Sequence, residues 1–371
     1  MRLRYSHQLT VGMKLGKSIF DQKLRLLLKD GTVLDSRYIS LIQSKQINFV
    51  FIDDPISEGL SINILVSDKI KYKLSNCIET YVSSIITKIP TYKKNFYDRF
   101  KFALDGEFIK RLPYKELRDY VEEVLYDIES NDAEKRFFNY YKYKRNFTEI
   151  NFDILIVSLL IGMKFEYGRQ ELIQLGVASL LHDIGWIFSP NYNEKNHDFS
   201  SQEIDDENHA RYGYQFLRDS KHLTALEYIP SLEHHELADG TGFPDKKESD
   251  FSFPDRLRRE KDNQIFRLSE IIGVASELIN RCQYEEANEI LSDFRVSNNI
   301  RYNPHIIEAL SFVFNPFPIS VEVSLTSKDS KSIATGIVIS SVIPRFIPSV
   351  KTMEFKVIPA DEVSRLNINI I

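Results

Sequence analysis

The sequence predicts a mainly α protein, in which a long helical region is flanked by a small N-terminal α/β unit and a small C-terminal β extension. From about residue 67 to residue 315, apolar residues recur at three- and four-residue spacing, which is typical of helices that bury one face. After Pro316 and Pro318 the chain is rich in Val, Ile and Thr, the residue types that strands favour. The first 55 residues show short extended runs separated by turn residues.

These changes in character divide the chain into four expected segments. They are a small, mostly β N-terminal α/β domain at 1–60, a helical linker region at 61–145, an all-helical domain at 146–315 and a β extension at 316–371.

In the first segment we expect strands at 9–20, 24–28 and 48–52. A helix should begin near Asp35 or Ser36, both good N-cap residues, and end at Lys45. In the last segment we expect strands at 319–325, 333–342 and 350–357. Polar loops should interrupt the long helical domain at about 189–203 and 239–263.

Composition excludes several classes of protein. A chain of 371 residues with 43% hydrophobic residues can build two or three folded units. The formal charge of −5 argues against a generic nucleic-acid binder, because such proteins carry a basic excess. Cys77 and Cys282 lie too far apart in sequence to suggest a disulfide framework, so a reducing compartment fits.

No segment resembles a membrane span or a signal peptide. The longest strongly apolar stretch, 152–163, is shorter than the ~20 residues that a span needs, and it contains Asp153. The first 20 residues alternate polar and apolar types and have no apolar signal core. We therefore expect a protein of the cytoplasm that makes no membrane contact.

Residues 135–145 interleave basic and aromatic side chains. This pattern can stack on single-stranded nucleic acid. The simpler interpretation is a helix whose aromatic side chains pack inward or against a partner while its cationic side chains stay solvated. The net negative charge of the chain favours this interpretation. Binding to nucleic acid is therefore not expected.

The histidines suggest a metal site. Six of the eight fall between positions 182 and 235, and His182-Asp183, His209 and the pair His234-His235 lie at or near the ends of helix-like runs. Imidazoles with one carboxylate suit Fe, Mn or Zn, whereas Ca and Mg prefer oxygen-rich sites. An Asp can bridge two ions about 4 Å apart, and such a pair can activate a water for attack on phosphate.

A glycine-containing loop follows the double histidine. Its sequence is Asp239-Gly240-Thr241-Gly242-Phe243-Pro244, which on its own predicts only a tight turn. Because the loop follows two candidate metal ligands, it is also a candidate wall of a substrate pocket.

Together these motifs resemble those of the HD-GYP family, a branch of HD-type phosphohydrolases that acts on cyclic di-GMP. The similarity lies in His182-Asp183-Ile184-Gly185, in His209 with Tyr212 and Gly213, and in His234-His235-Glu236 followed by the loop that ends at Pro244. It extends more weakly over about 145–315. The N-terminal unit, with Val11-Gly12-Met13 and Lys29-Asp30-Gly31-Thr32, is similar to the small domain that often precedes this module.

The resemblance implies a set of site residues. Metal ligands would be His182, Asp183, His209, His234 and His235, with His182 and Asp183 also taking part in catalysis. Substrate contacts would come from Asp239, Gly240, Gly242, Phe243, Pro244, Arg267 and Arg281. For the two arginines, charges on a helix surface are an equally good interpretation.

The resemblance also implies an activity. The chain would be a phosphodiesterase that hydrolyses cyclic di-GMP, or a related nucleotide, with one or two divalent transition-metal ions, Fe or Mn, that activate water. The alternative is an inactive or weakened receptor that binds the nucleotide and signals through partner proteins. A homodimer is compatible with either function.

The sequence departs from the family at several positions. A lysine that contacts phosphate in the family is replaced by Trp186, and the signature tyrosine by Phe243. The family's first histidine should fall near Ile150-Asn151, and its last aspartate aligns with Gly273. One ion would therefore lack two ligands. The acids that could replace them are Glu149, Asp153 and Glu270.

Overall fold

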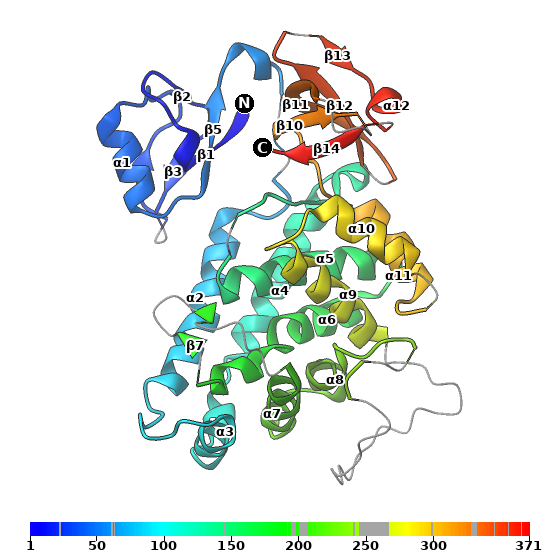
Figure 1. Cartoon of the computed structure of the whole chain (residues 1–371). Coiled ribbons are helices and arrows are strands. Elements are labelled where there is room, and N and C mark those ends of the chain that lie inside the picture. The colour runs from blue at the N-terminus through cyan, green and yellow to red at the C-terminus, as the bar shows by residue number, and fades with distance from the viewer. Residues whose placement is uncertain are drawn as a thin grey trace. The chain divides into compact units, whose positions relative to one another are not determined.

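The computed structural model groups the chain into two compact units (Figure 1). Unit 1 comprises residues 1–65, 137–143 and 314–371, and unit 2 comprises residues 66–136 and 144–313. The residues described are 1–21, 24–60, 62, 64–143, 145–190, 192–193, 198–199, 206–239, 242–244, 267–297, 300–327, 332–344, 346–354, 356–364 and 366–371.

The predicted mainly α class is confirmed, because helices make up most of unit 2 and the larger sheets lie in the terminal parts of the chain. The four predicted segments are distributed over the two units. The first and last fall mainly in unit 1, and the middle two fall mainly in unit 2. Their exact boundaries remain a prediction.

The N-terminal part of unit 1 contains a three-stranded sheet in the order β1-β5-β2. Its elements are β1 (Arg2–Tyr5), β2 (Lys14–Leu15), β3 (Ile19–Phe20), β4 (Leu26–Leu28), α1 (Ser36–Ser44) and β5 (Phe49–Asp53). The predicted helix is confirmed, and the Asp35 carboxylate caps it by accepting from the Tyr38 amide at 2.8 Å.

The prediction of one strand over 9–20 was wrong. Gly12 adopts a φ of +94° in a turn that precedes β2, and a bend at Gly16 and Lys17 separates β2 from β3. Strand β1 was not predicted. It pairs antiparallel with β5, with Arg2 opposite Ile52 and Tyr5 opposite Phe49.

The C-terminal part of unit 1 is a five-stranded antiparallel sheet in the order β13-β12-β11-β10-β14, which confirms the expected β extension. Its elements are β10 (Glu322–Thr326), β11 (Ser332–Val342), β12 (Ile347–Thr352), β13 (Val357–Ile358), α12 (Ala360–Val363) and β14 (Asn367–Ile370). Buried Val323, Val338 and Val350 form its core.

The helix predicted over 135–145 was wrong. Within this segment β6 (Phe138–Asn139) forms a short parallel pair with β9 (Phe314–Asn315). The aromatic side chains do pack inward, as the simpler interpretation held. Tyr140 is buried and stacks on Phe314 with ring centroids 5.8 Å apart. A surface that stacks on bases would need these rings exposed.

Unit 2 is built from helices. They are α2 (Asp68–Ile86), α3 (Phe96–Asp105), α4 (Tyr114–Ser130), α5 (Phe147–Lys164), α6 (Arg169–Leu181), α7 (Asp206–Arg218), α8 (Ala225–Glu233), α9 (Arg267–Arg281), α10 (Ala287–Val296) and α11 (Pro304–Val313). Helix α5 is buried on nearly all sides and packs against α6 and α9. Helix α8 packs against α6, α7 and α9, which brings the ends of several helices to one place.

Most of the two predicted polar loops, 189–203 and 239–263, lies outside the described residues. Inside the first loop, β7 (Tyr192–Asn193) pairs antiparallel with β8 (Asp198–Phe199). Among the helices that the structure describes, none combines the length and the apolar character needed to cross a bilayer.

Candidate metal centre

Five predicted metal ligands meet where the ends of these helices converge in unit 2. His182 is the C-cap of α6, and Asp183 begins the short 3-10 helix Ile184–Phe188. His209 lies in α7, His234 is the C-cap of α8, and His235 follows it. Four of the five lie at or just beyond the C-terminal end of a helix, and His209 lies in the first turn of α7.

The ligand atoms lie close together. Nε2 of His209 is 3.2 Å from Nε2 of His234 and 3.1 Å from Nε2 of His235. Asp183 Oδ1 is 3.2 Å from Nε2 of His209 and 3.3 Å from Nε2 of His234. The other oxygen, Oδ2, is 3.4 Å from Nε2 of His182. Two overlapping groups result: His209, His234 and His235, and His182, Asp183 and His234.

Backbone carbonyls determine the tautomers of two of these histidines. Nδ1 of His234 lies 2.9 Å from the Pro230 carbonyl oxygen, and Nδ1 of His182 lies 2.8 Å from that of Ser179. A carbonyl only accepts hydrogen bonds, so each Nδ1 carries the proton and donates it. In the neutral ring, Nε2 then keeps its lone pair and faces the cluster, as in a metal ligand.

Burial favours the protonation states that metal binding requires. Burial lowers the pKa of His182 to about 4. Burial, together with the nearby His234 and His209, also holds the pKa of His235 well below its usual value. Burial acts to raise the pKa of Asp183, but the surrounding imidazoles outweigh it and hold that pKa well below the ordinary value. Neutral imidazoles and an ionised carboxylate are the forms that bind metals.

These observations test whether the residues fit a divalent transition metal. Imidazole lone pairs and carboxylate oxygens converge within 4.8 Å of one another in each group, and acceptors so close together repel unless a cation lies between them. Three imidazoles and one carboxylate are a donor set that suits Fe, Mn or Zn. The cluster therefore fits such an ion.

Two glycines allow the elements to approach this closely. A Cβ atom at Gly185 would overlap the backbone carbonyl of His209, and one at Gly273 would overlap that of His234. Ser231 adds a bond from its hydroxyl to the His182 carbonyl at 2.7 Å. The backbone positions of the histidines are thus determined by close contacts that larger residues would prevent.

Comparison with known proteins identifies the family of this region. Residues 154–281 match the sequence model of the HD domain family. This region is an HD domain. The resemblance seen in the sequence is therefore confirmed for its HD domain, the fold of metal-dependent phosphohydrolases, and the cluster above lies within the matched range.

One solved structure found as similar is Bd1817, a HDG"Y"P protein from Bdellovibrio bacteriovorus. It has 14% sequence identity and a TM-score of 0.41, and the alignment covers 83% of this chain and 97% of that one. A comparison with curated proteins found no match.

Trp186 stands where the resemblance led us to expect the family lysine. Its ring stacks on the imidazole of His209, with centroids 4.1 Å apart and an angle of 12° between the planes. The sequence indicated only that a cation is absent here. The structure adds that the replacement covers one face of a metal-ligand candidate and restricts its ring.

Part of the signature loop lies beside the cluster. The Phe243 amide donates to the His235 carbonyl at 3.1 Å, and Gly242 packs so closely on the same carbonyl that a Cβ there would overlap it. The guanidinium of Arg211, from α7, lies 5.1 Å from the centre of the Phe243 ring. Pro244 is half-buried and Asp239 is exposed. Gly240 lies outside the described residues.

Sequence reasoning did not single out Arg211 or Ser276. The Ser276 hydroxyl, on α9, lies 3.3 Å from Nε2 of His182. These two residues are 94 positions apart in the chain, so no local pattern could indicate the contact. Arg211 follows His209 by two positions, and a basic residue beside a candidate ligand was the available signal.

The two predicted substrate arginines have protein partners. Arg267 pairs with Glu270 at 3.1 Å and lies 5.5 Å from the centre of the Phe165 ring. Arg281 is 2.7 Å from Glu285 and 2.6 Å from Asp293. Arg281 thus matches the interpretation as a surface charge, and the substrate role of both residues remains a prediction.

The acids proposed as replacement ligands also form hydrogen bonds or ion pairs with other residues of the protein. Glu149 forms a capping box with Asn146 at the start of α5. Asp153 forms a buried ion pair with Arg145. Glu270 pairs with Arg267, and Asn303 lies 3.3 Å away; burial raises the pKa of Glu270.

Asn151 stands where the family's first histidine was expected. Its side chain is fully buried, and its amide nitrogen and oxygen have no hydrogen-bond partner among the residues described. Burying an amide without hydrogen bonds costs folding free energy. Asn151 is therefore also a candidate ligand of an ion, in place of the family's first histidine.

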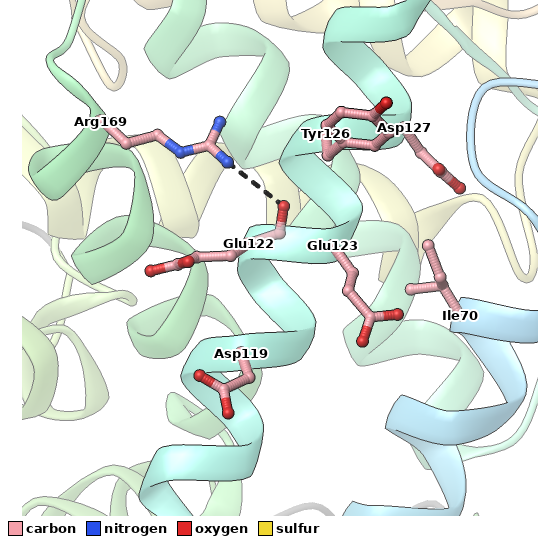
Figure 2. Close-up of a pocket in the computed structure, with 7 residues that line it drawn as sticks. All are labelled: Ile70, Asp119, Glu122, Glu123, Tyr126, Asp127 and Arg169. Atoms are coloured by element: carbon pink, nitrogen blue, oxygen red, sulfur yellow. Dashed lines mark hydrogen bonds between the residues drawn. The ribbon is translucent and has the colours of Figure 1, made fainter.

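A hollow of about 500 Å³ lies elsewhere in unit 2, lined from α2, α4 and α6 (Figure 2). It contains four acidic side chains, and three of them have protein partners: Arg118 Nε lies 3.8 Å from a Glu122 carboxylate oxygen, and Lys73 donates to the Glu123 carboxylate at 2.8 Å. Asp127 accepts from the Ser67 amide at 2.9 Å. No histidine lines this hollow, so the cluster in the HD domain is the better candidate site.

Proposed function

We propose that the HD domain hydrolyses a phosphodiester bond of cyclic di-GMP, or of a closely related nucleotide, with the help of a divalent transition metal. The observation that supports this proposal most is that Asp183 lies beside His209 and His234, and that these two histidines converge with His235. His235 is the least buried of these, so substrate would approach from its side. When bound, the ion would lower the pKa of a water and offset negative charge on the phosphate.

The chain's own residues have distinct roles in this proposal. Asp183 supplies the negative charge that balances the cation. The Pro230 carbonyl keeps the lone pair of His234 directed at the cluster. Trp186 holds the imidazole of His209 from one face and excludes water there. Each role keeps the ligands in place before substrate arrives, so binding requires no rearrangement.

Phe243 and Arg211 are the proposed nucleotide contacts. An aromatic ring offers a surface on which a guanine base can stack. The guanidinium above this ring can pair with a phosphate or with the guanine edge, and it would supply a cation in place of the lysine that Trp186 replaces. Asp239, Gly240, Gly242 and Pro244 would shape the loop that carries Phe243.

The alternative proposal is a receptor that binds the nucleotide without turnover and signals through partner proteins. Trp186 favours it, because an indole cannot neutralise phosphate charge as the family lysine does. Loss of one such charge contact can slow a reaction 10²–10³-fold while leaving the pocket intact. A homodimer would be compatible with either function.

Incubation of metal-loaded full-length protein with cyclic di-GMP separates the two functions. Chromatography should detect pGpG or GMP if the chain is an enzyme. Saturable binding without product would support the receptor. His235→Ala should abolish turnover, whereas His305→Ala, which removes an exposed histidine, should not. Absence of both binding and product would refute both proposals.

A further inference from the structure

The two overlapping groups of candidate ligands cannot both be complete. His234 Nε2 belongs to each group, but an imidazole nitrogen has one lone pair and binds one ion. If His234 acts with His209, His235 and Asp183 Oδ1, that ion has four ligands, which a transition metal accepts. The other side then retains only Nε2 of His182 and Oδ2 of Asp183.

Both ring nitrogens of His182 already lie within hydrogen-bonding distance of other protein groups. His182 is fully buried, its Nδ1 donates to Ser179, and its Nε2 is 3.3 Å from the Ser276 hydroxyl. Since Nε2 carries no proton in this tautomer, the serine hydroxyl is the donor. An ion at this nitrogen would have to displace a hydrogen bond in a dry environment.

Packing also prevents an acidic side chain at position 273. Gly273 lies against the His234 carbonyl, and any side chain there would overlap that oxygen. The nearby acids on α5 and α9 do not compensate. Asp153 is held by Arg145, and Glu270 is held by Arg267 and Asn303. Moving Asp153 to the cluster would break its buried ion pair with Arg145.

We propose that the HD domain binds one metal ion per chain, through Asp183, His209, His234 and His235. His182 is then a packing residue that keeps the cluster dry, its ring meeting that of His234 edge-on with centroids 4.8 Å apart. This inference rests on the proposed metal-dependent function, but it can fail separately, because an ion count of two would leave that function standing.

The chain contains its own probe of this site. Trp186 is the only tryptophan in the sequence, and it stacks on His209. Its fluorescence therefore reports ion binding at the proposed ligands directly. Metal-free full-length protein should be titrated with Co²⁺ or Mn²⁺ while this fluorescence is recorded, and the metal content should be measured after desalting.

The expected result is a fluorescence endpoint at one equivalent and one retained ion per chain. His235→Ala should lose both the endpoint and the ion, whereas His182→Gln and the matched control His305→Ala should keep both. Two ions in the unmodified protein, with one lost in His182→Gln or Asn151→Ala, would overturn the inference. No retained ion would instead refute the metal-dependent function. The number of ions retained by the unmodified protein distinguishes one bound ion from two, even if a variant does not fold.

Discussion

Replacement of Asp153 by asparagine should destabilise unit 2 strongly and leave its metal content unchanged. The side chains of Arg145 and Asp153 are 2% and 6% exposed and form an ion pair. Asp153→Asn removes the negative charge of this buried ion pair with the Arg145 guanidinium. Breaking a buried pair in this way costs about 3–5 kcal/mol of folding free energy. For a domain of this size that corresponds to a fall in Tm of roughly 6–20 °C.

Urea unfolding followed by Trp186 fluorescence measures this change, because Trp186 lies in the same unit. The double variant Arg145→Met with Asp153→Leu should recover most of the loss, since an apolar pair can replace a buried ion pair. Asp132→Asn is the matched control. Asp132 also pairs with a cation, Lys135, but both side chains are exposed, so little change is expected.

Measuring the retained metal of Asp153→Asn distinguishes a role of Asp153 as a metal ligand from a role as the ion-pair partner of Arg145. If this acid were a ligand, Asp153→Asn would reduce the retained metal and change stability mainly in the metal-loaded protein. If it serves only Arg145, the loss of stability is the same with and without metal. A variant of normal stability that has lost metal would therefore refute the reasoning.

Three further predictions concern the cluster and a buried thiol. Gly273→Asp should destabilise the HD domain by about 1–3 kcal/mol, measured by urea unfolding, because its Cβ would overlap the His234 carbonyl. Trp186→Ala should weaken metal affinity roughly 2- to 12-fold in a competition titration, since a stacked aromatic pair contributes about 0.5–1.5 kcal/mol, and Trp186→Phe should restore most of it through the ring on His209. Burial raises the pKa of Cys282 to about 12, so the folded state keeps its proton as pH rises through the unfolded value. Alkylation of Cys282 at pH 8 should therefore require unfolding, and its contribution to stability should fall as pH rises above about 8.5.

Local patterns predicted the first helix and two of the C-terminal strands, whereas the strand expected over 350–357 is divided between β12 and β13 and β14 was not predicted. Asp35 marked the start of α1 because a carboxylate before a helix satisfies a free amide. The error at 135–145 arises from tertiary contacts, which local patterns do not reveal. Its aromatic residues pack on distant parts of unit 1, as Tyr140 does on Phe314, and that tertiary contact outweighs any local helix preference.

The candidate site was predicted as a set of residue types, but not as a set of contacts. Histidines and an aspartate in a motif are visible in the sequence, whereas the hydrogen bond between Ser276 and His182 joins two helices far apart in the chain. The sequence also suggested that Asp153 could become a ligand, because it lies near a vacated position. Its partner Arg145 was equally near, and only the packing shows that the two charges satisfy each other.

Gly273 shows why a missing ligand need not be replaced nearby. The contact between α9 and α8 at this glycine positions the His234 backbone, and thereby directs His234 Nε2 toward His209 and Asp183. The same contact leaves no room for a side chain at position 273, where the family's aspartate was expected. If the HD domain binds one ion as proposed, adding an acid at position 273 for a second ion would therefore also require moving α9 away from the His234 carbonyl.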